Sequence, residues 1–384
     1  MKILSIEAAV FQLPRRRNFK WAGLNGELGR FVLVQVRTED GLTGYGEATA
    51  LPDWGGDAGR RGGESSATVV HLVNDIFAPA LQGHDATAIT AAHQIMDRLV
   101  VGNSYAKCAV DIALYDILGK VVGLPVYRLL GGAARPAVSI AHMVGLLPEI
   151  QAIDEAVGAI GDGVGALQIK GGVDAVRDVS LIRALRRELG QAVTLRLDAN
   201  QGYGGAREAQ RVVGQLAEAG VSLVEQPAVG MAHMAEVTRT ARVPVVADES
   251  CWDAADAMDL ANQRGADCIS IYLAKAGGFA AAAAVAAIAE ARQIRCDING
   301  SIESAVGNAA NLHFAMATPS VNLACVIPVS APAGRHPWSI AGRYYEDDIV
   351  REPFPVRDGA LLPLDAPGLG IDVDEAALAR YRCT

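Results

Sequence analysis

The sequence predicts an α/β protein, a (β/α)-barrel of the TIM type preceded by an α+β domain. Short β-rich apolar runs alternate with helical patterns between residues 166 and 301, and each run ends in polar residues. These polar ends recur about every 23 to 28 residues, the length of one strand plus one helix. Alternating strands and helices predict a parallel sheet, and at this repeat number a barrel. The first 48 residues instead alternate like antiparallel strands.

The barrel is expected to have eight strands, at residues 138–142, 166–170, 193–197, 221–224, 243–246, 268–271, 294–298 and 322–326. Segments between them, such as 206–217 and 254–261, repeat apolar residues at steps of three and four, which is typical of helices. The Ala-rich run 276–289 is too short to span a bilayer and is expected to be a barrel helix.

The segments on either side of the barrel are expected to form a cap. Strands are predicted at 1–13, 30–36 and 42–48, the last two joined by an Asp-Gly turn, and helices at 65–81, 87–100 and 104–122. After the barrel, short strands within 344–355 and 368–373 and a helix at 374–380 are expected to pack on the first domain. The predicted division is an α+β capping domain at 1–135, a catalytic barrel at 136–340 and a returning segment at 341–384.

Composition narrows the class of protein. The 384 residues are 51% apolar and 20% charged, with a net charge of −9, which is typical of a soluble globular protein and argues against a nucleic-acid partner. The six cysteines form no CxxC pair and are expected to be reduced thiols of a cytoplasmic protein. Glu7 interrupts the apolar stretch that a secretory signal would need, so we expect neither a signal nor a membrane anchor.

Three carboxylates follow three consecutive barrel strands. Asp198, Glu225 and Asp248 each come at the carboxyl end of a predicted strand, where barrel enzymes carry their chemistry. Carboxylates brought together repel one another unless a cation joins them. Oxygen ligands without Cys or a His cluster favour Mg²⁺, with Mn²⁺ as a substitute.

Two loops of the first domain carry aromatic and charged residues. One spans 15–21 and ends in Trp21, and the other spans 51–56 and contains Trp54. They are either solvated turns or a lid over the barrel mouth. The basic residues of the first loop, together with Trp54, suggest a substrate whose distal group is anionic or partly apolar. His142, at the end of the first barrel strand, either reaches the mouth or is a structural histidine.

Several motifs, in this order and spacing, resemble the muconate-lactonizing (muconate cycloisomerase) subgroup of the enolase superfamily, within the mandelate racemase–muconate lactonizing enzyme family. They are Asp198-Ala199-Asn200, Val224-Glu225-Gln226-Pro227, Ala247-Asp248-Glu249-Ser250, Lys275-Ala276-Gly277-Gly278, Gly300-Ser301-Ile302-Glu303-Ser304 and Gly368-Leu369-Gly370-Ile371. The resemblance covers nearly the whole chain. It implies a cap whose loops close on a small carboxylate substrate, Mg²⁺ held by the three carboxylates, a homo-oligomer, and removal of a proton α to the carboxylate.

The resemblance also assigns the base and shows two departures. Lys170 matches the second lysine of the family's Lys-x-Lys motif, but Gln168 stands where the first would be. Opposite Lys170, where subgroup members have a lysine on the sixth strand, strand parity favours Tyr272, with Lys275 as the alternative. The candidates for binding or orienting the substrate are Asn200, Gln168, Lys275, Trp21, Trp54 and Glu303.

These departures favour a one-base reaction. Lys170 would remove the α-proton, and a metal ion would stabilise the enolate. A tyrosine of ordinary pKa is a poor match for a second lysine, so a cycloisomerase or dehydratase is favoured over a racemase or epimerase of an amino or hydroxy acid. A class I aldolase using Lys170 as a Schiff base, and a non-catalytic metal-binding relative, stay open as alternatives.

Overall fold

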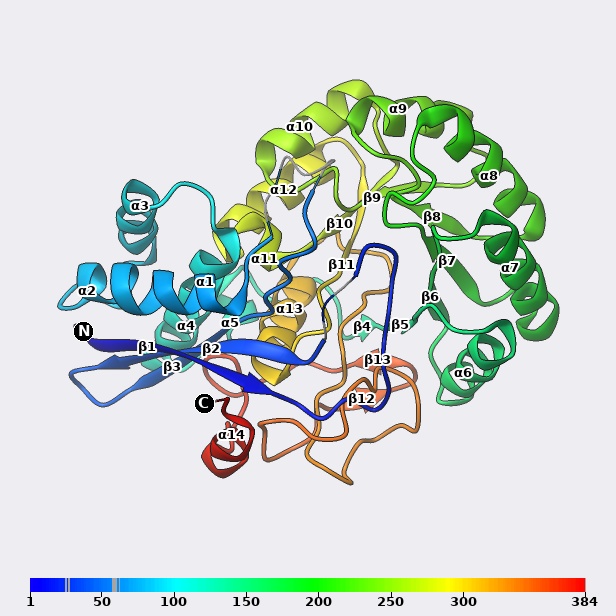
Figure 1. The fold of residues 1–384 in the computed structure, drawn as a ribbon. Helices are drawn as coiled ribbons and strands as arrows, with labels where there is room; N and C mark the ends of the chain where they lie inside the picture. Colours follow the sequence, from blue (N-terminus) through cyan, green and yellow to red (C-terminus); the bar gives the residue numbers. More distant parts are fainter. Residues whose placement is uncertain (25, 27, 57–60, 62, 384) are drawn as a thin grey trace.

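The computed structural model describes residues 1–24, 26, 28–56, 61 and 63–383. It consists of a cap, in which helices pack on an antiparallel sheet, and a parallel sheet enclosed by an arc of helices (Figure 1). The predicted fold class, a barrel with an α+β cap, is confirmed. In the described part of the chain no helix is long and apolar enough to cross a membrane.

The cap sheet has the order β1-β2-β3 and is antiparallel throughout. Its strands are β1 (Ile3–Gln12), β2 (Arg30–Thr38) and β3 (Thr43–Ala48), with Gly41 in the turn at a φ of 86°. Helix α4 (Ser104–Val122) packs directly on β3, because a Cβ on Gly44 or Gly46 would lie 2.2 Å or 1.8 Å from a carbonyl oxygen of that helix. The other cap helices are α1 (Ser66–His71), the π-helix η1 (Leu72–Phe77), α2 (Ala78–Leu81), α3 (Ile89–Leu99) and α5 (Val126–Leu129).

The barrel sheet runs in chain order from β5 to β11 with parallel pairing. Its strands are β5 (Ala141–Val144), β6 (Ala166–Lys170), β7 (Thr194–Asp198), β8 (Leu223–Glu225), β9 (Val245–Ala247), β10 (Cys268–Ile271) and β11 (Arg295–Ile298). The helices outside it are α6 (Glu149–Gly161), α7 (Ala175–Leu189), α8 (Ala206–Ala219), α9 (Met231–Thr240), α10 (Ala254–Gln263), α12 (Phe279–Ala291) and α13 (Ala305–Ala317). These helices cover the outer side of the sheet in Figure 1.

The expected eighth strand is not a regular strand. Residues 321–326 form isolated parallel bridges and no continuous ladder, with Val321 bridged to Cys296 and Cys325 to Ile140. The backbone N–H groups of Cys325 and Ala141 still link this segment to the first strand region, at 2.8 Å each. On the other edge, the N–H groups of Asn322 and Val326 donate to the Cys296 and Ile298 carbonyls at 3.0 Å and 3.1 Å. Backbone hydrogen bonds therefore close the sheet without a continuous ladder.

The predicted first strand, residues 138–142, is divided. Its beginning forms β4 (Val138–Ser139), which pairs with β13 (Ala360–Leu361), which in turn pairs with β12 (Val356–Arg357). The strands expected within 344–355 and 368–373 are present only as isolated bridges, which pair Val350 with Val373, Tyr345 with Arg15 and Gly368 with Pro125. The predicted last helix is present as α14 (Glu375–Tyr381), which contacts β1.

The Ala-rich barrel helix starts later than predicted. Lys275 belongs to the short helix α11 (Leu273–Ala276), and Gly277 and Gly278 then have φ angles of 97° and 129°. A Cβ at Gly278 would lie 2.4 Å from the carboxyl carbon of Asp111, which accepts a 2.8 Å hydrogen bond from the Phe279 N–H. Helix α12 thus begins where the barrel meets cap helix α4.

Candidate active site

Three acidic side chains lie next to one another at the carboxyl ends of neighbouring strands. Lys170 on β6 is the register partner of Asp198 on β7, which is the partner of Glu225 on β8. Asp248 directly follows β9. The exposed fractions of Asp198, Glu225 and Asp248 are 0%, 0% and 1%. The structure therefore brings the three predicted carboxylates and the predicted base together out of solvent.

Two basic side chains pair with the first two carboxylates. Lys170 Nζ lies 2.5 Å from Asp198 Oδ2. Arg196, which shares a strand face with Asp198, places its Nε 3.2 Å from Glu225 Oε2. The same guanidinium lies 2.5 Å from Oδ2 of Asp297 on β11. This pairing links Glu225 to the far side of the barrel interior.

Amide side chains complete the contacts of these acids. Gln168 Nε2 donates to Glu225 Oε2 at 2.9 Å and to Asp198 Oδ2 at 3.3 Å. The Asn200 N–H donates to Asp198 Oδ1 at 2.9 Å, and Asn200 Nδ2 donates to Glu249 Oε1 at 3.1 Å. An amide at position 168 thus hydrogen-bonds to two carboxylates without adding a charge.

The accumulated negative charge shifts the pKa values of the site. Burial, with repulsion from Asp198, raises the pKa of Glu225 to about 8. Burial also raises the pKa of Asp248. Burial opposes the charged form of Lys170, but attraction to Asp198 and Glu225 outweighs it, so the pKa of Lys170 is raised. Positive charge bound among the carboxylates would act in the opposite direction and favour the neutral amine.

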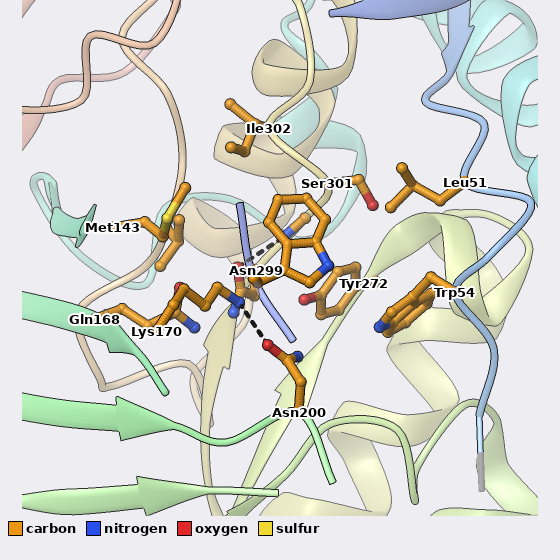
Figure 2. Close-up of a pocket in the computed structure, with 13 residues that line it drawn as sticks. Leu51, Trp54, Met143, Gln168, Lys170, Asn200, Tyr272, Asn299, Ser301 and Ile302 are labelled. Carbon is orange, nitrogen blue, oxygen red and sulfur yellow. Dashed lines mark hydrogen bonds between the residues drawn. The ribbon is translucent and has the colours of Figure 1, made fainter. Parts of the chain in front are cut away.

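A small cavity opens beside Lys170. Polar and apolar residues are mixed around it, and in Figure 2 Lys170 and Tyr272 reach it from opposite sides. Lys170 Nζ also lies 3.5 Å from Asn200 Oδ1. The described residues that line the cavity are Trp21, Leu51, Trp54, Met143, Gln168, Lys170, Asn200, Tyr272, Asn299, Gly300, Ser301, Ile302 and Val326.

Tyr272 is held between the metal-binding candidates and the cap. Its hydroxyl donates to Asp248 Oδ2 at 3.1 Å. Its ring stacks on that of Trp54, at 5.6 Å between centroids, and Trp54 stacks in turn on Trp252 at 5.2 Å. The cap loop that carries Trp54 therefore rests on the barrel through a ladder of three rings.

Lys275 is buried and does not line the cavity beside Lys170. Its Nζ donates to Asp248 Oδ1 at 2.6 Å, to the Asp248 carbonyl at 2.9 Å and to the Ser270 carbonyl at 2.8 Å. It also lies 4.3 Å from the centroid of the Tyr272 ring. An orienting role of Lys275 would therefore act through the carboxylate of Asp248.

The first cap loop covers Lys170. Trp21 is 6% exposed, and Lys170 Nζ lies 5.2 Å from the centroid of its ring. Upstream, Arg16 and Arg17 both form ion pairs with Glu155 of α6. Both loops predicted as a possible lid thus contribute a tryptophan to the cavity, while two of the basic residues anchor the loop to the barrel.

His142 and Glu303 lie behind the cavity. His142 is 0% exposed; its Nε2 is 3.1 Å from Glu155 Oε1, and its Nδ1 accepts from the Gly342 N–H at 3.1 Å. These contacts give it a structural role. Glu303 Oε1 accepts from the Ser301 N–H at 2.8 Å, and burial raises the pKa of Glu303 to about 7. Glu303 therefore supports the loop that lines the cavity.

Comparison with known families decides the class of this site. Residues 5–131 match the family model described as "Mandelate racemase / muconate lactonizing enzyme, N-terminal domain". Residues 151–377 match the family model described as "Enolase C-terminal domain-like". The chain belongs to the enolase superfamily. This confirms the resemblance inferred from the motifs, and the chain is an enzyme of the mandelate racemase–muconate lactonizing type.

Individual relatives of this superfamily member cover its whole length. Muconate cycloisomerase 1 of Rhodococcus opacus is 32% identical over 99% of this chain and 98% of its own. The crystal structure of 2-chloromuconate cycloisomerase from Rhodococcus opacus 1CP has a TM-score of 0.90 at 30% identity and covers 100% of both chains. The structure of N-succinyl Arg/Lys racemase from Bacillus cereus ATCC 14579 has a TM-score of 0.89 at 26% identity, covering 100% of this chain and 99% of its own.

Members of the superfamily generally use a divalent metal ion, and the donor set here fits one chemically. Asp198, Glu225 and Asp248 offer only oxygen atoms, all buried, and burial together with repulsion from Asp198 raises the pKa of Glu225, a shift that a bound cation would oppose. In the part of the chain that the structure describes, no three acidic, His or Cys side chains already have the spacing of metal ligands. Lys170 and Lys275 instead pair with two of the carboxylates.

Sequence reasoning assigned no role to several residues of this site. Arg196 and Asp297 form a buried ion pair, and each lies two positions before a residue at the mouth, Asp198 or Asn299. Because strand residues two apart share a face, this spacing was a usable signal. Trp252 had no such signal, since its role depends on where the cap loop meets the barrel.

Proposed function

We propose that this enzyme removes the α-proton of a carboxylate substrate with Lys170 as its single base, in a cycloisomerase or dehydratase reaction. We propose further that Asp198, Glu225 and Asp248 hold Mg²⁺, for which Mn²⁺ substitutes. One observation carries the first part: Lys170 is the only charged side chain among the described residues that line the cavity. A proton acceptor at that position faces the space where a substrate would lie.

The opposite side of the cavity supports a one-base reaction. A two-base racemase needs groups of similar strength on both faces of the α-carbon. Here Tyr272 occupies the side opposite Lys170, with its hydroxyl hydrogen-bonded to Asp248. Lys275 is committed to three acceptors and lies behind that ring. Its amine is therefore not directed at the cavity.

The proposed chemistry uses one face of the substrate. Lys170 Nζ takes the proton from the α-carbon, and the electron pair moves into the substrate. In a dehydratase a double bond forms between the α- and β-carbons while the β-hydroxyl leaves with a proton from the Lys170 ammonium. In a cycloisomerase the same amine removes or returns the α-proton as the ring opens or closes. A bound divalent ion would supply positive charge next to the substrate carboxylate, where negative charge grows.

Three amide side chains would orient the substrate beside Lys170, those of Gln168, Asn200 and Asn299. All three line the cavity, and Gln168 and Asn200 also hold the carboxylates through hydrogen bonds. Glu303 would act indirectly, through the backbone of Ser301. These contacts fix the carboxylate end of a substrate relative to Lys170.

A racemase or epimerase is the second candidate. The observation that favours it is the close structural match with N-succinyl Arg/Lys racemase of Bacillus cereus. In that case the Tyr272 hydroxyl would have to return a proton to the face opposite Lys170. Membership in the enolase superfamily removes the main argument for an aldolase, which rested on a barrel lysine alone.

Exchange of the α-proton in D₂O with Mg²⁺, followed by NMR over a panel of sugar acids, amino acids and muconate-like acids, tests the proposal. Wild type should exchange one α-proton of a substrate. Lys170→Ala should lose exchange by about 10²-fold to 10⁴-fold, the usual contribution of a general base. Tyr272→Phe, which keeps the ring stack and removes the hydroxyl, should still exchange.

The other outcomes are distinct. If Tyr272→Phe keeps exchange but loses inversion of the α-carbon, the enzyme is a racemase. Full exchange by Lys170→Ala would show that Lys170 is not the base. Borohydride trapping of a carbonyl substrate on Lys170 would support an aldolase, whereas Mg²⁺ binding with no exchange of any acid would support a non-catalytic relative.

A further inference from the structure

A buried carboxylate outside the cavity bonds to the loop that follows the base. Asp178, in the first turn of α7, is 0% exposed and does not line the cavity beside Lys170. Its Oδ2 accepts a 2.8 Å hydrogen bond from the Gly172 N–H, two residues after Lys170. The same oxygen accepts a 2.8 Å hydrogen bond from the hydroxyl of Tyr203, in the loop after β7. One carboxylate oxygen therefore joins the loops that follow β6 and β7.

The neighbouring Arg177 binds a second backbone group of the same turn. Its Nη1 donates to the Lys170 carbonyl and to Asp178 Oδ1, at 3.0 Å each. Its Nη2 donates at 2.9 Å to the carbonyl of Leu147, in the loop after β5. The pair formed by Arg177 and Asp178 thus bonds to the loops after three successive barrel strands. The backbone of Lys170 is held directly at its carbonyl and, two residues later, at an N–H group.

The loops after β6 and β7 are packed closely against each other. Gly172 has a φ of 85°, and a Cβ at this position would lie 1.9 Å from the carbonyl oxygen of Ala199. A Cβ at Gly202 would lie 2.1 Å from the carbonyl oxygen of Gly172. The backbones of the two loops are therefore in direct contact, and Asp178 bonds to both loops.

The contacts of Asp178 require a carboxylate. The Gly172 N–H and the Tyr203 hydroxyl bond to its Oδ2, and Arg177 bonds to its Oδ1. Burial and the negative charge of Asp178 raise the pKa of Tyr203, so the hydroxyl keeps its proton and donates. In Asp178→Asn one oxygen becomes an amide NH₂ group, which cannot accept a hydrogen bond. At least one of the donors from Gly172 and Arg177 then loses its acceptor.

We propose that Asp178 is a positioning residue, which sets the place of Lys170 relative to Asp198 by holding the loops after β6 and β7 together. The inference rests on the proposed function, in which Lys170 is the base. Lys170 Nζ lies 2.5 Å from Asp198 Oδ2 and 3.5 Å from Asn200 Oδ1, so both partners of the amine come from the neighbouring strand end. A shift of one loop against the other would move the amine relative to these groups. Small displacements of a catalytic group are costly in rate.

Amide hydrogen exchange of the Mg²⁺-loaded protein, followed by mass spectrometry, tests the link without any substrate. In Asp178→Asn the peptides that contain residues 170–173 and 200–204 should both exchange about 10-fold faster than in wild type, because the contact that closes them is lost. Faster exchange in only one of the two loops, or in neither, would overturn the inference.

Asp174→Ala is the matched control for this measurement. Asp174 caps the same helix by accepting from the N–H groups of Val176 and Arg177, and it accepts from neither Gly172 nor Tyr203. Its loss should speed exchange within residues 175–178 and leave the peptide that contains residues 200–204 unchanged. Equal acceleration of that peptide in Asp174→Ala and Asp178→Asn would show a general loosening of α7 and refute a specific link.

The kinetics of substrate α-proton exchange test the consequence for the reaction. Asp178→Asn should lower kcat by about 10-fold to 100-fold with KM nearly unchanged, because the base is displaced while the lining of the cavity is kept. Tyr203→Phe removes one of the same contacts and should lower kcat by a smaller factor. The double variant should be no slower than Asp178→Asn, since both changes break the same link. Asp174→Ala should keep the wild-type kcat even where its urea midpoint is lowered.

The two proposals fail in different ways. If wild type exchanges no acid, the proposed function fails and the positioning role falls with it, whereas the amide exchange still decides whether Asp178 joins the loops. If wild type exchanges a substrate and Asp178→Asn keeps its kcat, the proposed function stands and the positioning role is refuted. If Asp178→Asn does not fold, as judged by circular dichroism, Tyr203→Phe decides both tests, and wild-type values in that variant would overturn the inference.

Discussion

Removing the guanidinium of Arg196 should destabilise the protein strongly. Arg196 lies between Glu225, at 3.2 Å, and Asp297, at 2.5 Å, and both acids are 0% exposed. Arg196→Met keeps a side chain of similar length but leaves two buried carboxylates without this cation. Glu225 would keep hydrogen bonds from Gln168 and Asn299. Asp297 would keep none that the structure shows, because its Oδ1 already has no partner.

The magnitude follows from the loss of one member of a buried ion pair, which typically costs about 3–5 kcal/mol. Asp297→Asn should cost less, about 1–3 kcal/mol, because Arg196 stays paired with Glu225 and the amide oxygen can still accept a hydrogen bond. The double variant removes one positive and one negative charge. It should therefore be more stable than the sum of the single changes implies, by at least about 1 kcal/mol.

Urea unfolding at pH 8, followed by circular dichroism and fluorescence, measures the free energy of unfolding of wild type, the two single variants and the double variant, which together form a double-mutant cycle. The divalent ion that we propose at these carboxylates should bind only the folded protein and recover part of the stability lost in Arg196→Met, by about 2.7 kcal/mol at 100 times its Kd. A cost below about 1 kcal/mol for Arg196→Met, or additive costs in the cycle, would refute the reasoning.

Two further predictions concern groups outside the carboxylate cluster. Burial raises the pKa of Asp348 to about 7, so the folded state holds a proton that the unfolded chain loses near pH 4. Stability should therefore fall as pH rises from about 4 to 7, and Asp348→Asn should flatten that slope in urea titrations; equal slopes would contradict this. Glu155→Gln weakens the anchor of the loop that carries Trp21. It should raise KM more than it lowers kcat and speed tryptic cleavage of that loop, whereas the exposed neighbour Asp154→Asn should change neither; matching cleavage rates in the two variants would rule out the anchor.

Much of the fold could be predicted because the barrel repeats one pattern. The polar end of each strand marks the same edge of the sheet, so residues far apart in sequence, such as Lys170 and Glu225, could be placed together without any tertiary information. Strand ends were less accurate. Strands β7 and β8 include Asp198 and Glu225 as their last residues, one residue beyond the predicted ends, because the register is set by pairing with neighbouring strands.

The closing segment and the tail could not be predicted in the same way. Residues 322–326 have an apolar composition suited to a strand, but their backbone hydrogen bonds to the two sheet edges do not form a continuous ladder. The tail forms β12 and β13 against β4, which the sequence assigned to the barrel. In both cases the backbone conformation depends on partners that are distant in sequence and have no repeat to reveal them.

The two candidates opposite Lys170 show how far strand parity can be used. Parity directs Tyr272 to the cavity that it lines, because Tyr272 directly follows β10 and keeps the extended conformation in which alternate residues share a face. Parity does not constrain Lys275, whose long flexible stem leaves helix α11 and returns to the Asp248 carboxylate. The amine therefore reaches the same carboxylate as the Tyr272 hydroxyl from behind the ring. A lysine near this barrel mouth can thus bind a carboxylate of the site without contacting the substrate. Its position alone does not make it a second base.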